Sequence, residues 1–333
     1  AAVDDVVIPF NYSSFTGAFY GAVPPVLEDR QRFSFKKYLM VGRGDVASIR
    51  DILHELRGTQ TGSFSGRVRN AVNKTPETEA SVVTYDESGA PYSQHTPNAN
   101  GVFSGTYAPG KYTYRVVAEG RFTTEPVAFE VKAGAKTGVE IELPLAGLVN
   151  VRIRGEDGRP MPGKCSFVGR YGQGASGRDP KTFLFDLQAG EHRRPTDLIP
   201  DVVMDESTRE FLEHVTYVGV ETVTEPMRPG VYRAVCSRGI EYNTVEQEVT
   251  ITAGLVSAVD VTLKHELPTP GWASGDYHLH ADPSVDSSMP LDERVTTVAA
   301  EGVDVAVATD HNFITDYGPV LTRLGLSQHL QSM

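Results

Sequence analysis

The sequence predicts a mainly β protein in which two β-sandwiches in tandem precede the first βαβ unit of a (β/α) barrel. Runs of alternating apolar and polar residues recur from residue 62 to residue 265 with turn residues between them, a pattern typical of β-sandwiches. The 32 glycines and 21 prolines fit many short strands better than long helices. Beyond residue 272, an apolar strand, an amphipathic helix and a second apolar strand indicate a parallel βαβ unit.

The charge and hydropathy of the chain argue against two classes of partner. Its formal net charge is −12 and no cluster of lysine and arginine occurs, so a nucleic-acid partner is not expected. No stretch of about 18 apolar residues occurs, so no membrane span is expected either. The opening residues AAVDD lack the basic and apolar regions of a signal peptide, although a processed chain of an exported protein is compatible with them.

Residues 1–60 are expected to be the end of a preceding, mainly β domain followed by one helix. Apolar residues predict strands at 6–10 and 33–41. A helix is predicted from Asp45, a suitable N-cap, to Leu56, with Gly58 as its stop. Its apolar stripe consists of Val46, Ile49, Ile52, Leu53 and Leu56.

Residues 61–145 are predicted to form the first sandwich. Its strands are expected at 63–69, 80–85, 101–107, 108–117, 127–131 and 138–143. The motif order G-x-V, A-x-V-x-x-Y-D, G-x-F and P-G-x-Y resembles that of carboxypeptidase-regulatory-like (transthyretin-like) domains. This resemblance implies a binding or spacing module, on fold analogy alone.

Residues 146–267 repeat the scheme as a second predicted sandwich, with an insertion at 170–227. The motif Pro229-Gly230-Val231-Tyr232 echoes Pro109-Gly110-Lys111-Tyr112 of the first. Within the insertion, a capping box from Ser207 to Glu210 predicts a helix start. Cys165 and Cys236 fall on strands of this sandwich, and the sequence is compatible either with one disulfide, which would indicate an oxidising compartment, or with two buried thiols.

Residues 272–333 are predicted to form the N-terminal part of a barrel. A strand over 272–280, a helix over 290–301 and a strand over 303–309 give the βαβ order, and another helix is expected over 317–326. Polar residues lie at the end of both strands. His278 and His280 end the first strand, and Asp310 and His311 follow the second. Barrel enzymes carry their active sites at this end of the strands, so these side chains should lie together.

The residue types at these strand ends indicate a metal site. His278 and His280 are two positions apart on a strand and should point to the same face. Neutral imidazoles suit Zn, Fe or Mn, and Asp282 and Asp286 in the following loop are candidate oxygen ligands. Shells that mix histidine and carboxylate lower the pKa of a bound water in hydrolytic sites.

These motifs resemble the PHP (polymerase and histidinol phosphatase) superfamily of metal-dependent hydrolases, especially its CehA/McbA-type branch. The likeness is carried by Gly275-Asp276-x-His278-x-His280, by Asp286 and by Thr309-Asp310-His311-Asn312. It implies that His278 and His280 bind one divalent ion and that Asp286 and His311 help to bind a second. It also implies that Asp310 orients His311 in the catalytic site, and that two or more Zn, Mn or Fe ions occupy the complete barrel.

Two functions are compatible with these expectations. The first is a metal-dependent hydrolase of a small-molecule phosphoester, ester or amide, active only when further sequence or a second chain completes the barrel. That second chain would be the C-terminal remainder of the same protein. The alternative is a non-catalytic β-sandwich protein that binds or acts as a scaffold at a bacterial cell surface. The sandwich modules favour an exported protein, whether periplasmic, on the outer surface or extracellular.

Overall fold

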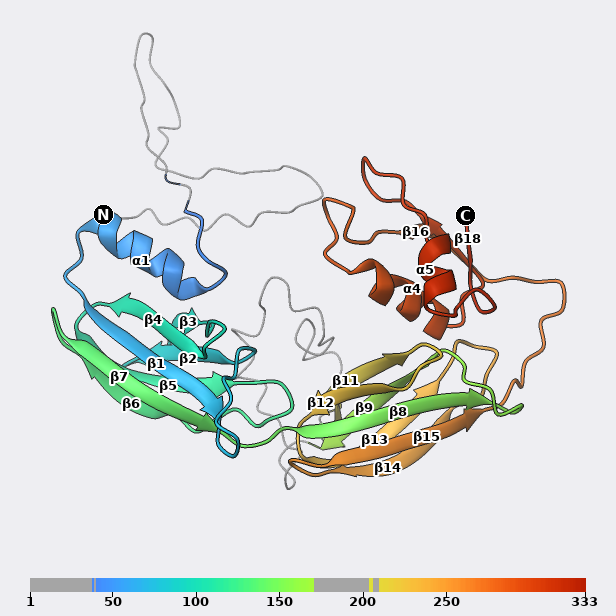
Figure 1. Cartoon of the computed structure of the whole chain (residues 1–333), viewed down its shortest axis with the longest axis horizontal. Helices are drawn as coiled ribbons and strands as arrows, with labels where there is room; N and C mark the ends of the chain where they lie inside the picture. The colour runs from blue at the N-terminus through green and yellow to red at the C-terminus, as the bar shows by residue number, and fades with distance from the viewer. Residues whose placement is uncertain (1–37, 39, 171–203, 206–209) are drawn as a thin grey trace, which may run out of the picture.

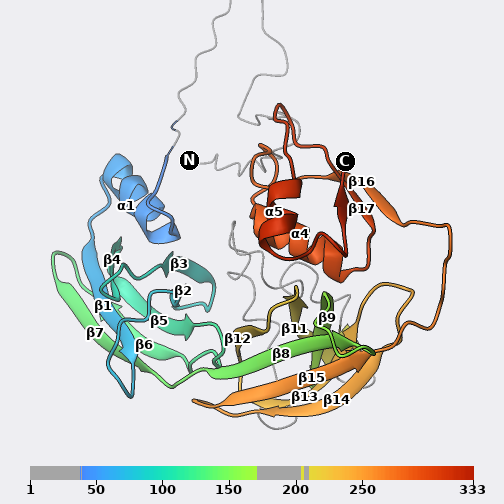
Figure 2. The ribbon, with the colours of Figure 1, turned by 45° about the vertical axis from the view of Figure 1, so that its right-hand side comes forward.

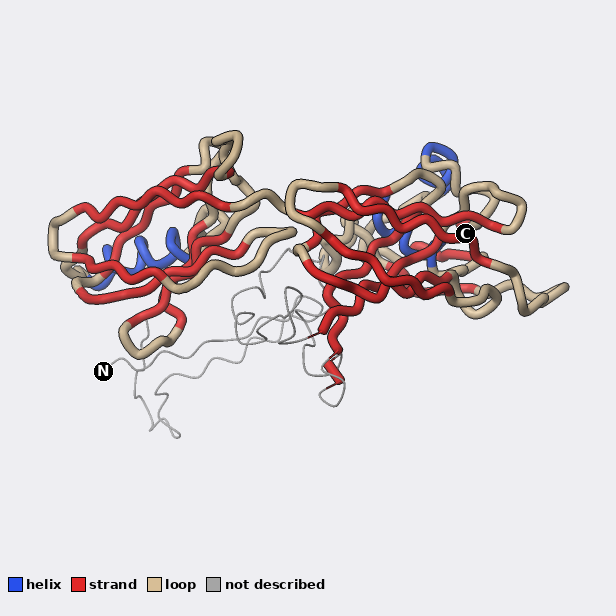
Figure 3. The backbone as a smooth tube through the Cα atoms, turned by 90° about the horizontal axis from the view of Figure 1, so that it is seen from below, coloured by secondary structure: helices blue, strands red, loops and turns tan. Residues whose placement is uncertain are grey.

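The computed structural model describes residues 38, 40–170, 204–205 and 210–333, and it shows two β-sandwiches followed by a smaller α/β unit (Figure 1). Seen from below, the sandwiches lie end to end (Figure 3). The C-terminal unit packs on the second sandwich, on the same side of the molecule as helix α1 (Figure 2). The expected mainly β fold with tandem sandwiches is confirmed.

The first sandwich packs a three-stranded sheet, β4-β1-β7, against a four-stranded sheet, β3-β2-β5-β6. The strands are β1 (Gly62–Asn70), β2 (Ser81–Asp86), β3 (Pro91–His95), β4 (Val102–Tyr107), β5 (Gly110–Val117), β6 (Val127–Val131) and β7 (Lys136–Leu143). Strand alternation turns Phe64 and Tyr107 inward, where both are fully buried. The ring of Phe64 stacks on that of Phe129 with the centroids 3.9 Å apart. Aromatic side chains of both sheets therefore supply much of this core.

Helix α1 (Val46–Arg57) covers the side of this sandwich formed by the edge strands β3 and β4. The Asp45 carboxylate caps it by accepting a hydrogen bond from the Ser48 backbone N at 2.9 Å. Gly58 ends it with φ 60°, a left-handed conformation that favours glycine. The predicted helix and both of its end signals are confirmed. The strand expected at 6–10, and most of that expected at 33–41, lie outside the described residues.

The second sandwich packs a three-stranded sheet, β12-β8-β15, against a five-stranded sheet, β10-β11-β9-β13-β14. Its strands are β8 (Gly147–Gly155), β9 (Gly163–Arg170), β10 (Met204–Asp205), β11 (Glu210–Val218), β12 (Val223–Met227), β13 (Gly230–Ser237), β14 (Val245–Ile251) and β15 (Val256–Leu263). Strands β10, β11 and β12 come from the range 170–227, so part of the expected insertion belongs to the sheets. The helix expected from Ser207 is wrong at Glu210, where β11 begins, because pairing with β9 overrides the local capping signal. Residues 206–209 lie outside the described residues.

Cys165 and Cys236 form a disulfide across β9 and β13. The antiparallel register places the two residues directly opposite each other, with their Cα atoms 4.0 Å apart. Both are fully buried. The alternative of two buried thiols is thereby excluded. The register of β9 with β13, which the sequence does not specify, decides between a disulfide and two free thiols.

The repeated P-G-x-Y motif has the same structural role in both sandwiches. The Tyr112 hydroxyl donates to the Ala108 carbonyl at 2.9 Å, and the Tyr232 hydroxyl donates to the Arg228 carbonyl at 3.0 Å. Each tyrosine thus closes the turn that leads into its own strand. In both sandwiches the first and last strands also pair in parallel, β1 with β7 and β8 with β15.

The C-terminal unit is a three-stranded parallel sheet, β16-β17-β18, with two helices. Its elements are β16 (Gly275–Leu279), α4 (Leu291–Ala300), β17 (Val305–Ala308), α5 (Gly318–Arg323) and β18 (Gln331–Ser332). Its core includes the fully buried Val295, Ala299 and Leu326. The predicted β-α-β order is confirmed, whereas a barrel is not present in the described residues. Among all the residues that the structure describes, no helix is both long enough and apolar enough to cross a bilayer.

The C-terminal unit is attached to the second sandwich by specific contacts. Lys164 on β9 forms an ion pair with Glu301, at 2.6 Å between Nζ and Oε1, and the Tyr217 hydroxyl donates to the same carboxylate at 3.2 Å. Gly239 and Gly302 allow the two backbones to approach closely, since a Cβ on Gly239 would lie 2.6 Å from the Glu301 carbonyl oxygen. The unit therefore has a defined position on the sandwich.

Candidate metal centre

The expected metal ligands lie where β16 and β17 end side by side. The Thr309 backbone N donates to the Leu279 carbonyl at 2.8 Å, and its hydroxyl donates to the same oxygen at 3.1 Å. These contacts keep the two strand ends together. His280 follows Leu279 and Asp310 follows Thr309. Because the two strands are parallel and paired, His280 and Asp310 lie next to each other.

Asp286 is the centre of the cluster. Its Oδ1 lies 2.8 Å from His280 Nδ1 and its Oδ2 lies 3.2 Å from His311 Nε2. One potential ligand atom from each of these three residues lies within 4.8 Å of the others. A carboxylate that lies beside two imidazoles has the donor chemistry of a zinc site with mixed nitrogen and oxygen ligands.

Ser284 organises the loop that carries Asp286. Its hydroxyl donates to Asp286 Oδ1 at 2.6 Å and accepts a hydrogen bond from the His311 backbone N at 2.9 Å. The hydrogen bond from Ser284, followed by that from His280, lowers the pKa of Asp286 to about 2. The carboxylate is therefore ionised at neutral pH and able to bind a cation.

Asp310 binds backbone and hydroxyl groups beside the cluster. Its Oδ1 accepts a hydrogen bond from the Ala281 backbone N at 2.7 Å, and its Oδ2 accepts one from the Thr315 hydroxyl. The residue is only 8% exposed. Asp310 thus fixes the backbone that follows His280. None of these contacts joins Asp310 to the His311 side chain, and the role expected for Asp310 in orienting His311 stays a prediction.

The structure brings together some, but not all, of the predicted ligands. His280, Asp286 and His311 form one group, whereas His278 lies beside it, with its ring centroid 5.0 Å from that of His280. The pairing of β16 with β17 is irregular between Asp276 and Leu279, so simple alternation does not describe this strand end. In the described part of the chain, only this one group of three potential ligands is found.

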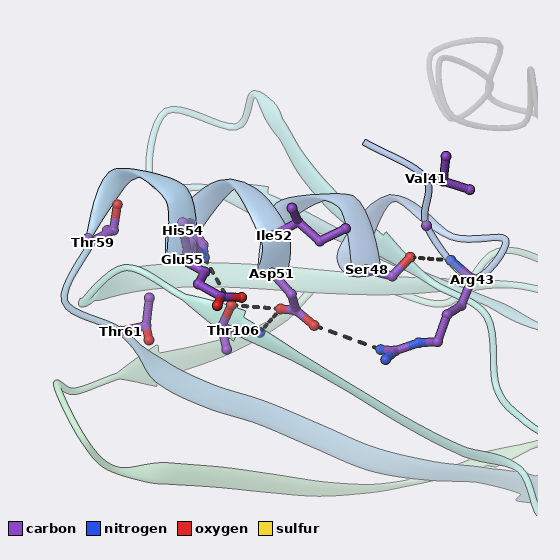
Figure 4. Close-up of a pocket in the computed structure, with 12 residues that line it drawn as sticks. Val41, Arg43, Ser48, Asp51, Ile52, His54, Glu55, Thr59, Thr61 and Thr106 are labelled. Atoms are coloured by element: carbon purple, nitrogen blue, oxygen red, sulfur yellow. Dashed lines mark hydrogen bonds and ion pairs between the residues drawn. The ribbon is translucent and has the colours of Figure 1, made fainter. Parts of the chain in front are cut away.

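A cavity of about 720 Å³ lies where α1 meets β4 (Figure 4). Asp51 accepts hydrogen bonds from the Thr106 backbone N at 2.7 Å and from the Thr106 hydroxyl at 2.6 Å. The Thr106 hydroxyl oxygen is also 3.0 Å from His54 Nδ1, which can donate to it. Burial lowers the pKa of His54, so the imidazole is neutral at pH 7. These groups satisfy one another and fix α1 on the sheet.

Comparisons with known proteins give matches among solved structures alone. No family model matches the chain, and no curated protein matches it. Among solved structures, the Bacillus anthracis TIE protein is similar over 67% of this chain and 36% of its own length, at 13% identity and a TM-score of 0.24. A streptococcal ancillary pilin is similar over 62% and 63%, at 14% identity and a TM-score of 0.30. The shaft pilin SpaA of Lactobacillus rhamnosus GG is similar over 63% and 100%, at 9% identity and a TM-score of 0.33.

These findings correct the expected family and activity. The structures found are the TIE protein and pilins, and a similarity this low supports no argument about function. No family model supports the PHP superfamily, and the described residues contain no barrel. The assignment to that superfamily and the metal-dependent hydrolase function are therefore wrong. The motifs at His278–His280 and Asp310–His311 were too short to carry a family assignment by themselves.

Proposed function

We propose that this chain is a non-catalytic β-sandwich module of an exported bacterial surface protein, where it acts as a rigid scaffold that presents a binding face. The architecture carries the proposal: two sandwiches with separate apolar cores lie end to end, and a third unit is docked on one of them. Such sandwiches usually bind or space other parts of a protein.

The joint between the sandwiches supports a scaffold role. Gly120 has φ 70°, and a Cβ there would lie 2.8 Å from that of Ala146. The Gly147 backbone N, at the start of the second sandwich, donates to the Gly120 carbonyl of the first at 3.2 Å. A Cβ on Gly120 would also lie 2.9 Å from the Pro226 Cβ of the second sandwich. These close contacts restrict rotation between the sandwiches, because the Gly147 hydrogen bond would have to break before the joint could bend.

The Cys165–Cys236 disulfide supports export. A disulfide between buried cysteines persists in an oxidising compartment and is rare in the cytosol. Both a periplasmic and an outer-surface location provide such an environment. We place the protein on the outer surface because a scaffold must present its binding face to a partner.

The proposal is tested by the state and location of the native protein. Intact cells are labelled with a membrane-impermeant amine reagent, thiols are alkylated, and the purified chain is examined by mass spectrometry. We expect labelled surface lysines such as Lys132 and an unalkylated peptide pair that contains Cys165 and Cys236. An unlabelled chain with both cysteines alkylated would overturn the proposal.

We also propose that His280, Asp286 and His311 bind one divalent ion, with zinc favoured by the two imidazoles. The ion would connect the ends of β16 and β17 to the loop that carries Asp286. Asp310 would act as a positioning residue, since it anchors the backbone after His280. The role of the ion would be to stabilise these loops.

Metal content and thermal stability test this site. We expect about one zinc per chain and a higher melting temperature of the C-terminal unit with zinc. His311→Gln should weaken zinc binding by at least about tenfold. His265→Gln is the matched control, because His265 is also an exposed histidine, 3.3 Å from the carboxylate of Glu241, but belongs to no group of three ligands. Equal zinc binding by both variants and the parent chain would refute the site.

A further inference from the structure

A cavity of about 830 Å³ lies between the second sandwich and the C-terminal unit. One wall is the segment that follows β13, from Ser237 to Tyr242, and another is the linker that precedes β16, from Thr269 to Ser274. The turn between α4 and β17 and residues 328–329 complete it. Lys164 on β9 also lines it, so five parts of the sequence form a single cavity, of a size that accommodates a small ligand.

The cavity wall mixes hydrogen-bond donors and acceptors. Several of its charged groups are already partly paired: Lys164 with Glu301, Asp304 with the Ser274 hydroxyl, and Glu241 with the Thr269 hydroxyl. Each of these carboxylates can accept further hydrogen bonds, because an ionised carboxylate has about four acceptor positions. Two cations and three carboxylates line the cavity, so its charge does not favour an anionic ligand.

Arg238 is the buried polar group of this cavity. It is 6% exposed, and its Nη1 lies 3.2 Å from His329 Nδ1. Its Nε has no hydrogen-bond partner, and its guanidinium lies 5.4 Å from the Tyr242 ring centroid. Among the described residues, no carboxylate is within ion-pair distance of it. A buried guanidinium partnered by an imidazole and an aromatic ring retains donor capacity for a polar ligand.

Trp272 provides an aromatic surface at the rim. It is 84% exposed, and Ile240 at the same cavity is 86% exposed. Both side chains lie at one cavity instead of being scattered over the surface, which is the arrangement of a ligand site with an apolar rim. The flat indole can stack on a ligand whose face carries C–H groups, while its N–H donates a hydrogen bond.

We propose that this cavity binds a neutral saccharide, with one sugar ring stacked on Trp272 and its hydroxyls bonded to Arg238, Glu241 and Asp304. A hydroxyl both donates and accepts, so it matches a wall that offers guanidinium donors beside carboxylate acceptors. The ring faces of a sugar carry the C–H groups that stack on an indole. This proposal rests on the proposed scaffold role. It adds to that role the class of ligand that the binding face would bind.

The chain itself provides the measurement, because Trp272 is its single tryptophan. The full chain is titrated with maltotetraose, cellotetraose and triacetylchitotriose up to roughly 10 mM, and with a tetragalacturonate as the acidic comparison, while tryptophan emission is recorded. We expect a saturable blue shift or quenching with at least one neutral oligosaccharide. No saturable change with any of these neutral sugars, or a change with the tetragalacturonate alone, would overturn the proposal.

Variants locate the binding in this cavity. Trp272→Ala should weaken binding of the neutral sugar by about tenfold in calorimetry, and Trp272→Phe should retain most of it. Phe313→Ala is the matched control, because Phe313 is an exposed aromatic residue (57%) that does not line the cavity. Unchanged affinity in Trp272→Ala would refute the assigned site. A surface-exposed, disulfide-bonded chain that binds none of the neutral sugars would refute the saccharide site and leave the scaffold role intact.

Discussion

The first sandwich is covered along the edges of β3 and β4 by helix α1, whereas the second sandwich has a disulfide between β9 and β13. The first contains a buried polar network in which the Tyr107 hydroxyl lies 2.6 Å from His95 Nε2 and 2.9 Å from the Thr84 hydroxyl. The second carries the C-terminal unit. The two sandwiches share an arrangement of strands but are stabilised differently, the first by packing of a helix and buried side chains and the second by a disulfide. The two should respond differently to mutation, reduction and acid.

The largest effect is expected from the aromatic core of the first sandwich. Phe64→Ala removes a fully buried ring that contacts Phe129, so the free energy of unfolding of this sandwich should fall by about 3–5 kcal/mol. Calorimetry that resolves the two sandwiches should show only the first transition shifted. Val127→Ala is the control, because Val127 on β6 is 44% exposed. Comparable losses in both variants would contradict the assigned core.

Removing the disulfide should affect the second sandwich alone. The bridge joins residues 71 positions apart, and its loss in a Cys165→Ala/Cys236→Ala variant should cost about 4.4 kcal/mol by the loop-entropy argument. Chemical denaturation with and without reductant measures this cost. A reductant that lowers the stability of the first sandwich equally would show that the two do not unfold independently.

Acid should destabilise the first sandwich through His95. Burial lowers the pKa of this imidazole from 6.5 to about 4, so the unfolded chain binds a proton more readily than the folded one. The associated stability is complete above pH 6.5 and is lost as pH falls through about 4, by an amount on the order of 3 kcal/mol. Denaturation midpoints measured from pH 7 to pH 4 test this. His95→Gln should flatten the profile, and an unchanged slope would refute the assignment.

The smallest effect is expected at the helix cap. Asp45→Ala removes the acceptor for the Ser48 backbone N and should destabilise α1 by about 1 kcal/mol. Hydrogen exchange of the first-turn amides should accelerate about fivefold. Glu87→Ala, which changes an exposed acid in a turn of the same sandwich, should leave those amides unchanged. Equal exchange rates in Asp45→Ala and the parent would mean that the helix depends on packing alone.

Local signals predicted local structure in this chain. Asp45 and Gly58 mark the ends of α1, and the repeated P-G-x-Y motif marks a turn that recurs with the same tyrosine hydrogen bond. The apolar runs after residue 272 gave the correct β-α-β order. These features depend on caps, turns and alternation, all of which are readable over a few residues.

Features that depend on distant pairing could not be predicted. The capping box at Ser207–Glu210 indicated a helix, but pairing with β9 made a strand from Glu210 onward. The choice between disulfide and thiols depended on the register of β9 with β13. Ser284, which bonds to both Asp286 and the His311 backbone, was missed because only its position two residues before an aspartate hints at that role.

The parallel pairing of first and last strands has a mechanical consequence. Because β1 and β7 run in the same direction, the chain enters the first sandwich at one end and leaves it at the other, and the same holds for β8 and β15. A pull on the two ends therefore loads eight paired positions of each ladder in shear, so their hydrogen bonds must fail together rather than one after another. In the second sandwich the covalent link between residues 165 and 236 also keeps the intervening chain from extending. A series of modules like the second sandwich would resist tension along its length, and would lengthen only slightly when one of them opens.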